Sequence, residues 1–350
     1  MVSVTFEVKP LSASFLANFR CIPLECGLFP SDSPPKESAT VKEFPRPAVT
    51  DEAITGFLAA GRIAGDARKL GVSLIQPGVR LEAVLLEVET FIRDQGGSPA
   101  FPAQTSRNQI AAHYCSKPND PMVYEPEDLV KIDIGVEVDG WVADNAATVY
   151  LGESAHGKKL VQASQDALAA AIAVAAPGVQ IRELSRAIEN AITAHGLKPV
   201  YNLTGHGVGR WLVHTAPQIP ATPDREGKAT LQPGMVIAIE PFATDGRGQV
   251  YEQGKAEIFA LVRKPHKFKN IDERVWNLIE KMQGLPFARR TFCDLPTGAV
   301  EATLLRLKRT GCLIDFPPLV DPDPSVRISQ AEHTLMILEN EVVVTTRDVC

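Results

Sequence analysis

Two aspartates near the middle of the chain have the spacing of a paired carboxylate site. Asp133 and Asp144 lie in apolar runs on either side of Asp139-Gly140, and an Asp-Gly pair between such runs predicts a two-residue hairpin turn. This turn places Asp144 opposite Gly135, so Asp133 is its diagonal neighbour on the same face. Two carboxylates side by side among apolar residues require a cation or a proton between them. A solvated hairpin with exposed aspartates is the alternative for this pair alone.

Three more residues favour a metal site over a solvated hairpin. His206 lies among glycines in the segment 203–209, and glycines allow a metal or another part of the backbone to approach closely. A histidine in such a loop is, by itself, more often structural. Glu240 and Glu332 each stand at the end of an apolar run, where a carboxylate needs a partner.

The complete set contains four carboxylates and one imidazole on strand-like segments. Oxygen ligands with one nitrogen suit Mn, Fe, Co or Zn, and four negative charges balance two dications. Two ions that share bridging carboxylates and a bridging water form the arrangement used by aminopeptidases. The residues by themselves therefore predict a hydrolase that uses two divalent ions.

The elements that position these residues include an internal repeat at an offset of 100 residues. The matching positions are Pro77-Gly78-Val79 with Pro177-Gly178-Val179, Leu81 with Ile181, Ile92 with Ile192, Gly96 with Gly196, and Pro99 with Pro199. Each copy predicts a turn, a helix of about four turns, a glycine stop and an extended segment. Two such copies predict a pseudo-symmetric domain with a site between its halves, and a chance match is the alternative.

The chain is expected to consist of an N-terminal arm and one large domain with an insertion. Residues 1–46 show no sustained periodicity, which favours a tail or loosely attached arm. Residues 47–350 are expected to form the main domain, which opens with a helix from Asp51 capped by Thr50. Within it, residues 257–326 contain two short amphipathic helices and end in a proline-rich segment. We expect this stretch to be a small helical subdomain inserted before the last strands.

Composition excludes several classes of protein. With 45% apolar and 22% charged residues and a net charge of -6, the chain is an ordinary globular protein without a basic surface for nucleic acid. The 6 cysteines have no CxxC spacing, which argues against a zinc ribbon or a disulfide framework. Neither a membrane span of about 18 apolar residues nor a secretory signal is evident. We therefore expect a cytoplasmic location with reduced thiols.

Taken together, the motifs resemble those of type II methionine aminopeptidases, in the short form that lacks the charged eukaryotic extension. The resemblance runs from about Asp51 to the C-terminus. It rests on Pro99-Ala100-Phe101-Pro102, Asn108-Gln109-Ile110-Ala111-Ala112-His113-Tyr114, Lys131-Ile132-Asp133, Ala143-Asp144, Gly205-His206-Gly207-Val208-Gly209, Ala238-Ile239-Glu240 and Glu332-His333-Thr334. It implies the α+β pita-bread fold, a pseudo-two-fold antiparallel sheet covered by helices, in agreement with the repeat.

The resemblance also implies a role for each candidate metal ligand. Asp133 would bind one metal ion, and His206 and Glu240 would bind the other. Asp144 and Glu332 would bridge the two ions, which would be Co, Mn, Fe or Zn. Glu240 would also help to take a proton from the bridging water.

Five further residues would contact the substrate. His113 corresponds to the family's catalytic histidine, which would donate a hydrogen bond to the scissile group or the attacking species. His214 corresponds to a second histidine that contacts the substrate, and its separation from His113 is close to the repeat offset, so the two would face each other. Phe101, Val213 and Phe242 match positions that line a methionine pocket, where apolar contact would hold the thioether.

Some features place the chain within the family and others depart from it. The stretch 257–326 falls where type II enzymes carry a helical, winged-helix-like insertion, and Gly284-Leu285-Pro286-Phe287-Ala288 fits its pattern. Asn145 and Cys115 stand where threonine is usual, and Ala331 stands where phenylalanine is usual. We expect these departures to affect local packing and rate more than the reaction.

The implied function is removal of the initiator methionine, with a preference for a small second residue. The partners would be the N-termini of nascent polypeptides, with the ribosome as a further candidate and no membrane or specific nucleic acid. One alternative is a prolidase or aminopeptidase P, against which the insertion and the lack of a large N-terminal domain weigh. The other is a non-catalytic relative that binds protein or RNA, but such relatives lose ligands and this chain keeps all five ligand types.

Overall fold

The computed structural model describes residues 50–224 and 227–347, so the predicted arm of residues 1–46 lies outside the described residues. In chain order the elements are α2 (Asp51–Leu74), α3 (Leu81–Asp94), β1 (Ser98–Pro99), β2 (Gln104–Arg107), β3 (Ile110–Ala112), β4 (Leu129–Val138), β5 (Trp141–Tyr150), α4 (Ala155–Val174), α5 (Ile181–Ala194), β6 (Lys198–Pro199), β7 (Thr204–Gly209), β8 (Leu212–Pro220), β9 (Val236–Ile239), β10 (Phe242–Thr244), β11 (Tyr251–Glu252), β12 (Ile258–Leu261), α6 (Glu273–Lys281), β13 (Phe287–Ala288), η1 (Arg289–Phe292), α7 (Thr297–Arg309), β14 (Leu313–Phe316), β15 (Leu319–Val320), β16 (Ile328–Gln330), β17 (His333–Ile337) and β18 (Val342–Val344).

The predicted repeat is confirmed in the structure. The helices α3 and α5, and likewise the strands β1 and β6, begin and end at positions 100 residues apart. Each helix follows a turn in which glycine has a positive φ, 84° at Gly78 and 82° at Gly178. The Gly78 N–H donates to the Tyr124 carbonyl, and the Gly178 N–H donates to the Leu231 carbonyl, at 2.8 and 2.7 Å. The two copies therefore share local geometry as well as sequence, so the match is not chance.

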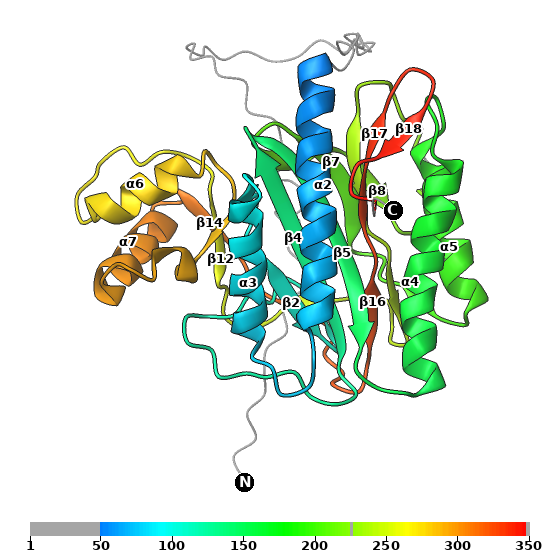
Figure 1. Ribbon diagram of the computed structural model, residues 1–350, viewed down its shortest axis with the longest axis horizontal. Coiled ribbons are helices and arrows are strands. Elements are labelled where there is room, and N and C mark those ends of the chain that lie inside the picture. The colour runs from blue at the N-terminus through cyan, green and yellow to red at the C-terminus, as the bar shows by residue number, and fades with distance from the viewer. Residues whose placement is uncertain (1–49, 225–226, 348–350) are drawn as a thin grey trace, which may run out of the picture.

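Each half of the repeat combines a helix pair with an antiparallel sheet. In the first half, β4 pairs with β1, β2 and β5, and α2 and α3 lie over this sheet. In the second half, a five-stranded sheet has the order β18-β17-β9-β7-β8, with the smaller sheet β16-β10-β6 beside it, and α4 and α5 pack on these strands. Figure 1 shows the four helices across one side of the strands. The predicted fold class, helices covering antiparallel sheet, is confirmed.

The first helix begins where the sequence predicted it. Thr50 caps α2, because its side-chain oxygen accepts a hydrogen bond from the Ala53 N–H at 3.2 Å. Along the helix, a Cβ on Gly61 would overlap the Thr345 carbonyl, so the glycine lets the C-terminal segment approach closely. Although α2 has 24 residues, no helix among the described residues is long and apolar enough to cross a membrane.

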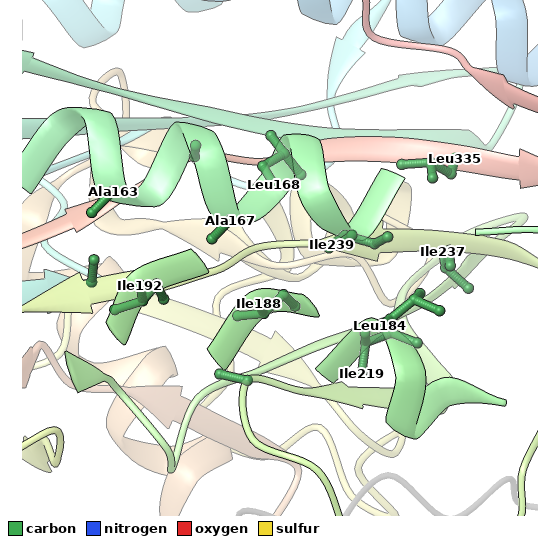
Figure 2. Packing of buried hydrophobic residues seen from close by; sticks show 14 of the residues in the cluster. Ala163, Ala167, Leu168, Leu184, Ile188, Ile192, Ile219, Ile237, Ile239 and Leu335 are labelled. Carbon is green, nitrogen blue, oxygen red and sulfur yellow. The ribbon is translucent and has the colours of Figure 1, made fainter. Parts of the chain in front are cut away.

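An apolar core fixes the strands of the second half. Ala167 of α4 and Ile188 of α5 face Ile239 of β9 and Leu335 of β17, as Figure 2 shows. Burying a large aliphatic side chain contributes roughly 1.5 to 3 kcal/mol. This packing holds the end of β9, which is immediately followed by Glu240.

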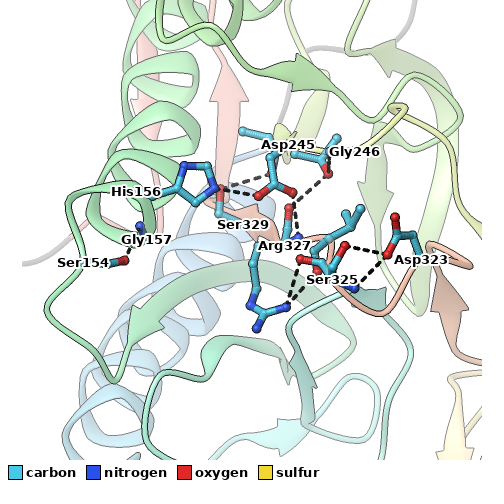
Figure 3. Close-up of polar contacts among 12 residues, drawn as sticks. Ser154, His156, Gly157, Asp245, Gly246, Asp323, Ser325, Arg327 and Ser329 are labelled. Atoms are coloured by element: carbon cyan, nitrogen blue, oxygen red, sulfur yellow. Dashed lines mark hydrogen bonds and ion pairs between the residues drawn. The ribbon is translucent and has the colours of Figure 1, made fainter.

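In the second half, polar contacts join the start of α4 to the loops next to β10 and β16 (Figure 3). Ser154 caps α4 by accepting a hydrogen bond from the Gly157 N–H at 3.1 Å. The Asp245 carboxylate accepts a hydrogen bond from the Arg327 N–H at 2.8 Å and contacts His156 Nε2 at 2.6 Å. These contacts tie α4 and the loop after β10 to the start of β16, the strand that leads to Glu332.

Between β11 and β15 the chain forms a unit with its own apolar core. Figure 1 shows α6 and α7 at one side of the molecule, away from the other helices. They pack on the three-stranded sheet β13-β12-β14, where Phe259, Trp276 and Leu304 are buried together. Asp272 caps α6 by accepting a hydrogen bond from the Arg274 N–H at 3.0 Å, which fixes the start of this helix. The periodicity pointed to the helices but gave no sign of the sheet.

Candidate metal centre

The predicted aspartate hairpin is confirmed in its register. Strands β4 and β5 pair Gly135 with Asp144, and the turn residues Asp139 and Gly140 have φ values of 51° and 85°. Asp144 is 3% exposed, so the alternative of a solvated pair is wrong. Asp133 and Asp144 meet on one face of the hairpin and repel each other there.

The glycines around His206 let three strands come together. A Cβ on Gly205 would overlap the Ala238 carbonyl of β9, and a Cβ on Gly207 would overlap the Ala216 carbonyl of β8. Both obstructions are backbone atoms, which cannot move aside as a side chain can. Glycine is therefore required for β7 to carry His206 between its two neighbours.

The orientation of the His206 ring follows from its hydrogen bond. Its Nδ1 lies 3.1 Å from the Gly207 carbonyl oxygen, which only accepts, so Nδ1 carries the proton. Nε2 then points toward Asp144 and Glu240, at 3.7 and 3.5 Å from their carboxylate oxygens. A neutral imidazole in this tautomer presents a lone pair to a metal ion.

The two glutamates reach the same place from strand ends. Glu240 follows β9, and Glu332 precedes β17 with its N–H bonded to the Ala146 carbonyl at 3.0 Å. The Gln330 side chain donates from Nε2 to both carboxylates, at 3.5 Å to Glu240 and 3.3 Å to Glu332. One amide thus holds two acidic side chains side by side.

These residues fit a divalent cation. Asp133 Oδ1, Asp144 Oδ1 and Glu332 Oε1 are buried without a hydrogen-bond partner among the described residues. Leaving such an oxygen unpaired costs about 1 to 3 kcal/mol, or more when it is charged. Ligand atoms of Asp144, His206 and Glu332 all lie within 4.8 Å of one another. A bound cation would satisfy the unpaired oxygens and balance their charge.

The pKa values of these acidic residues and of His206 also favour a bound cation. Burial raises the pKa of Asp133 to about 7, and burial followed by the charges of neighbouring carboxylates raises the pKa values of Asp144, Glu240 and Glu332 well above normal. Burial also lowers the pKa of His206 to about 4. Without a cation, the neutral form of each of these groups is favoured. A divalent ion instead favours ionised carboxylates and a neutral imidazole.

One cavity of about 320 Å³ brings all the candidate site residues together. The ten predicted residues on its lining are Phe101, His113, Asp133, Asp144, His206, Val213, His214, Glu240, Phe242 and Glu332. The metal centre therefore opens into a cavity large enough for a small ligand.

His113 is held in an unusual backbone conformation at the side of this cavity. Its φ is 65°, and its N–H donates to the Gln104 side-chain oxygen at 2.8 Å. Its Nδ1 lies 3.3 Å from the Pro317 carbonyl, and the ring stands edge-on to Phe316. Burial lowers the pKa of His113 to about 4, so the ring is neutral at pH 7.

The second predicted histidine borders the same cavity. His214, on β8, packs against His206 with ring centroids 4.3 Å apart. Burial, followed by the neighbouring His206 and His113, lowers the pKa of His214 well below its usual value. The His214 ring is therefore also neutral, and it can contact a small molecule bound beside the candidate metal-binding residues.

The apolar part of the cavity adjoins the aspartates. The Phe101 ring lies where a side chain on Gly135 would stand, and Gly135 is the cross-strand neighbour of Asp144. Val213 and Phe242 are also buried on the cavity lining. An apolar side chain bound here would lie next to the metal centre.

Several residues of the site carry no signal that was recognised in the sequence. Gln330 could have been found, because it stands two residues before Glu332 and alternate residues of an extended segment share a face. Ile258 and Phe316 line the cavity as paired residues of β12 and β14. No local pattern marks these two, since they reach the cavity only through tertiary packing.

The departures from the family pattern are accommodated locally. Asn145 donates from Nδ2 to the Ile134 carbonyl at 2.8 Å. Cys115 is buried and accepts a hydrogen bond from Arg290. Ala331 is 5% exposed and belongs to the apolar core of the second half.

The sequence and the fold of the chain are similar to those of known proteins. Residues 56–271 match the model described as metallopeptidase family M24. The chain is 39% identical over 298 residues to the methionine aminopeptidase of Archaeoglobus fulgidus, covering 85% of this chain and 99% of that one. It is 38% identical over 292 residues to that of Pyrococcus horikoshii, covering 83% and 98%. The crystal structure of methionine aminopeptidase from Thermotoga maritima has a TM-score of 0.64 at 23% identity, covering 85% and 98%, a likeness of fold.

Proposed function

This chain belongs to metallopeptidase family M24, and from that premise we propose that it removes the initiator methionine from new polypeptides by metal-dependent hydrolysis. The observation that carries the proposal is the meeting of four carboxylates and His206 beside an apolar cavity. The likeness to archaeal methionine aminopeptidases supports the substrate.

The proposed centre holds two divalent ions, Co, Mn, Fe or Zn. Asp133 would hold one ion, His206 and Glu240 would hold the other, and Asp144 and Glu332 would be shared by both. When bound, such ions polarise the scissile carbonyl and activate a water for attack. The unpaired carboxylate oxygens support this assignment of ligands.

The protein's own groups position the substrate and move protons. Phe101, Val213 and Phe242 hold the methionine side chain, and Glu240 takes a proton from the attacking water. With Nδ1 directed at the Pro317 carbonyl, the neutral His113 accepts a hydrogen bond at Nε2. We therefore propose an acceptor role for His113, in place of the donor role expected from the sequence.

His214 is proposed to contact the substrate across the cavity from His113. Both rings are neutral and half-buried, so a hydrogen bond from the substrate to either ring involves no desolvated charge. Together they would orient the peptide group next to the metal centre.

The proposal extends to organisation, partners and location. The described residues form the catalytic domain, with the winged-helix-like insertion at 257–326. The partners are the N-termini of nascent polypeptides in the cytoplasm, and the ribosome, where such termini emerge, is the partner to test for direct contact.

Peptide hydrolysis tests the function. Metal-free protein, supplied in turn with Mn, Co, Fe or Zn, is incubated with Met-Ala-Ser and with an Ala-Pro dipeptide. We expect release of methionine that depends on added metal, and no cleavage of the Ala-Pro bond. Preferential cleavage of Ala-Pro would favour the prolidase alternative, and inactivity despite full metal loading would favour a binding protein.

A further inference from the structure

A buried arginine connects the inserted unit to the first half of the repeat. Arg290, in η1, is 6% exposed and directs its two terminal nitrogens to different segments. Nη2 donates to the Glu89 carboxylate of α3 and, at 2.9 Å, to the Ala103 carbonyl. Nη1 donates to Cys115 Sγ and contacts the Ser116 carbonyl at 3.5 Å.

A contribution to stability alone does not account for this pair. Removing an arginine and a glutamate from water costs free energy that their attraction only partly returns. The pair instead fixes the orientation of neighbouring groups, because a planar guanidinium donates hydrogen bonds in fixed directions to several acceptors at once. The segments that it contacts therefore indicate what it does.

The Arg290–Glu89 pair holds both backbone polar groups of Ala103, a residue next to the cavity lining. The Ala103 N–H donates to Glu89 Oε1 at 3.1 Å, while its carbonyl accepts from Arg290. Ala103 lies between Phe101, whose ring lines the cavity, and Gln104. Fixing Ala103 therefore fixes the residues on either side of it.

Hydrogen bonds connect the segment around Ala103 to His113, the proposed catalytic histidine. Gln104 accepts a hydrogen bond from the His113 N–H at 2.8 Å, and the Thr105 N–H donates to the Tyr114 carbonyl at 2.9 Å. From the other side, Arg290 contacts the residues that follow Tyr114 directly. Because His113 has a positive φ of 65°, which an L residue rarely adopts, its surroundings must hold it there.

We infer that Arg290 is a positioning residue that keeps the segments carrying Phe101 and His113 aligned with the metal centre. Through it, the inserted unit is part of the catalytic apparatus and not an appended module. This inference rests on the proposed peptidase function, since alignment matters only if His113 and Phe101 act on a substrate.

The neighbouring Arg289 provides a matched control. It lies on the same 3-10 helix, but its contacts stay within or beside the inserted unit. It pairs with Glu257 and Glu301, donates to the Ala256 carbonyl at 2.6 Å and stacks on Phe259. Its replacement disturbs the unit without touching the segments around His113.

The test compares Arg290→Lys with Arg289→Lys in the full, metal-loaded protein. Lysine keeps the charge but carries one donor nitrogen, which cannot span both segments. We expect Arg290→Lys to lower kcat for Met-Ala-Ser roughly 10- to 100-fold with unchanged metal content, as misplacement of catalytic groups does. Amide hydrogen exchange should accelerate at residues 103–105 and 113–116. Arg289→Lys should keep kcat and the exchange of both segments close to wild type.

Wild-type kcat and wild-type exchange of both segments in Arg290→Lys would overturn the inference. Equal loss of kcat in both variants would do the same, because it would indicate general destabilisation. If Arg290→Lys does not fold, the double variant Arg290→Met with Glu89→Gln removes both charges at similar volume and must show the same loss. A wild-type protein that fails to cleave Met-Ala-Ser refutes the proposed function instead, while the exchange measurement still decides the positioning role.

Discussion

Glu332 is the residue at which burial and charge oppose each other most directly. It is 1% exposed, it lies beside other carboxylates, and one of its oxygens has no hydrogen-bond partner among the described residues. Such a residue destabilises a metal-free protein and becomes favourable only when a cation binds. In the proposed metal centre, metal binding and folding are therefore coupled at this side chain.

Glu332→Gln should consequently have opposite effects with and without metal. The metal-free variant should melt at or above the wild-type temperature, since glutamine avoids the cost of protonating or ionising a buried carboxyl group beside other carboxyl groups. Added metal should raise the melting temperature of the wild type but much less that of the variant, whose metal content and turnover should fall steeply. Melting curves, metal analysis and peptide assays measure this, with the exposed Glu341→Gln as control. Near-normal turnover of Glu332→Gln would refute the ligand assignment.

His113→Ala separates chemistry from metal binding. In the proposed mechanism His113 acts beside the metal ligands and not as one of them, so kcat should fall roughly 10²- to 10⁴-fold while metal content stays normal. A histidine that only satisfies hydrogen bonds would instead reduce activity in proportion to unfolding. Measuring kcat, melting temperature and metal content on one preparation distinguishes the two roles. A folded, metal-loaded variant with wild-type kcat removes His113 from the mechanism.

Strand β7 is closely enclosed by its two neighbouring strands. Its glycines allow β8 and β9 to approach on both sides, and His206 depends on that approach for its direction. A methyl group at Gly207 meets a backbone carbonyl, whereas one at Gly298 in α7 meets nothing within 4 Å.

Gly207→Ala and Gly298→Ala should therefore change stability in opposite directions. The first forces β7 and β8 apart, so it should lower the free energy of unfolding by about 1 to 3 kcal/mol and reduce metal affinity. The second should raise stability by roughly 0.5 to 1 kcal/mol, because alanine loses less entropy than glycine in a helix. Urea denaturation and metal titration measure both effects. A neutral Gly207→Ala would show that β8 can move, and that the glycine is not required.

At the scale of the whole molecule, the cavity limits the substrate. It lies between the two halves of the repeat, with residues of the inserted unit on its lining, and its volume is about 320 Å³. With methionine in the proposed apolar pocket, little room would remain beside the proposed metal centre for a second large side chain.

Peptides should accordingly be selected by their second residue. We expect efficient cleavage of Met-Gly, Met-Ala, Met-Ser and Met-Val peptides and very slow cleavage of Met-Lys and Met-Phe peptides. Values of kcat/KM for peptides that differ only at this residue provide the measurement, and Leu-Ala peptides control for the first position. Equal cleavage of Met-Lys and Met-Ala would contradict this specificity.

The sequence by itself determined the features that depend on local geometry. Asp139-Gly140 specifies a turn that only residues tolerant of positive φ can form, and this turn sets the register of β4 and β5. The glycines Gly78 and Gly178 mark the repeat in the same way. Ligand types and apolar runs then identified the carboxylates and His206, because an acidic group in an apolar run needs a partner wherever the chain takes it.

Only the tertiary structure decided which distant segments meet. Nothing local in Phe316 predicts that it lines the cavity, and nothing in Arg290 predicts that it reaches Glu89 and Ala103, about 200 residues earlier in the chain. The sheet β13-β12-β14 escaped prediction for the same reason, since strands of two to four residues have too little periodicity to recognise. Contacts of this kind arise from the packing of whole elements, and packing depends on shape in three dimensions that no short stretch of sequence contains.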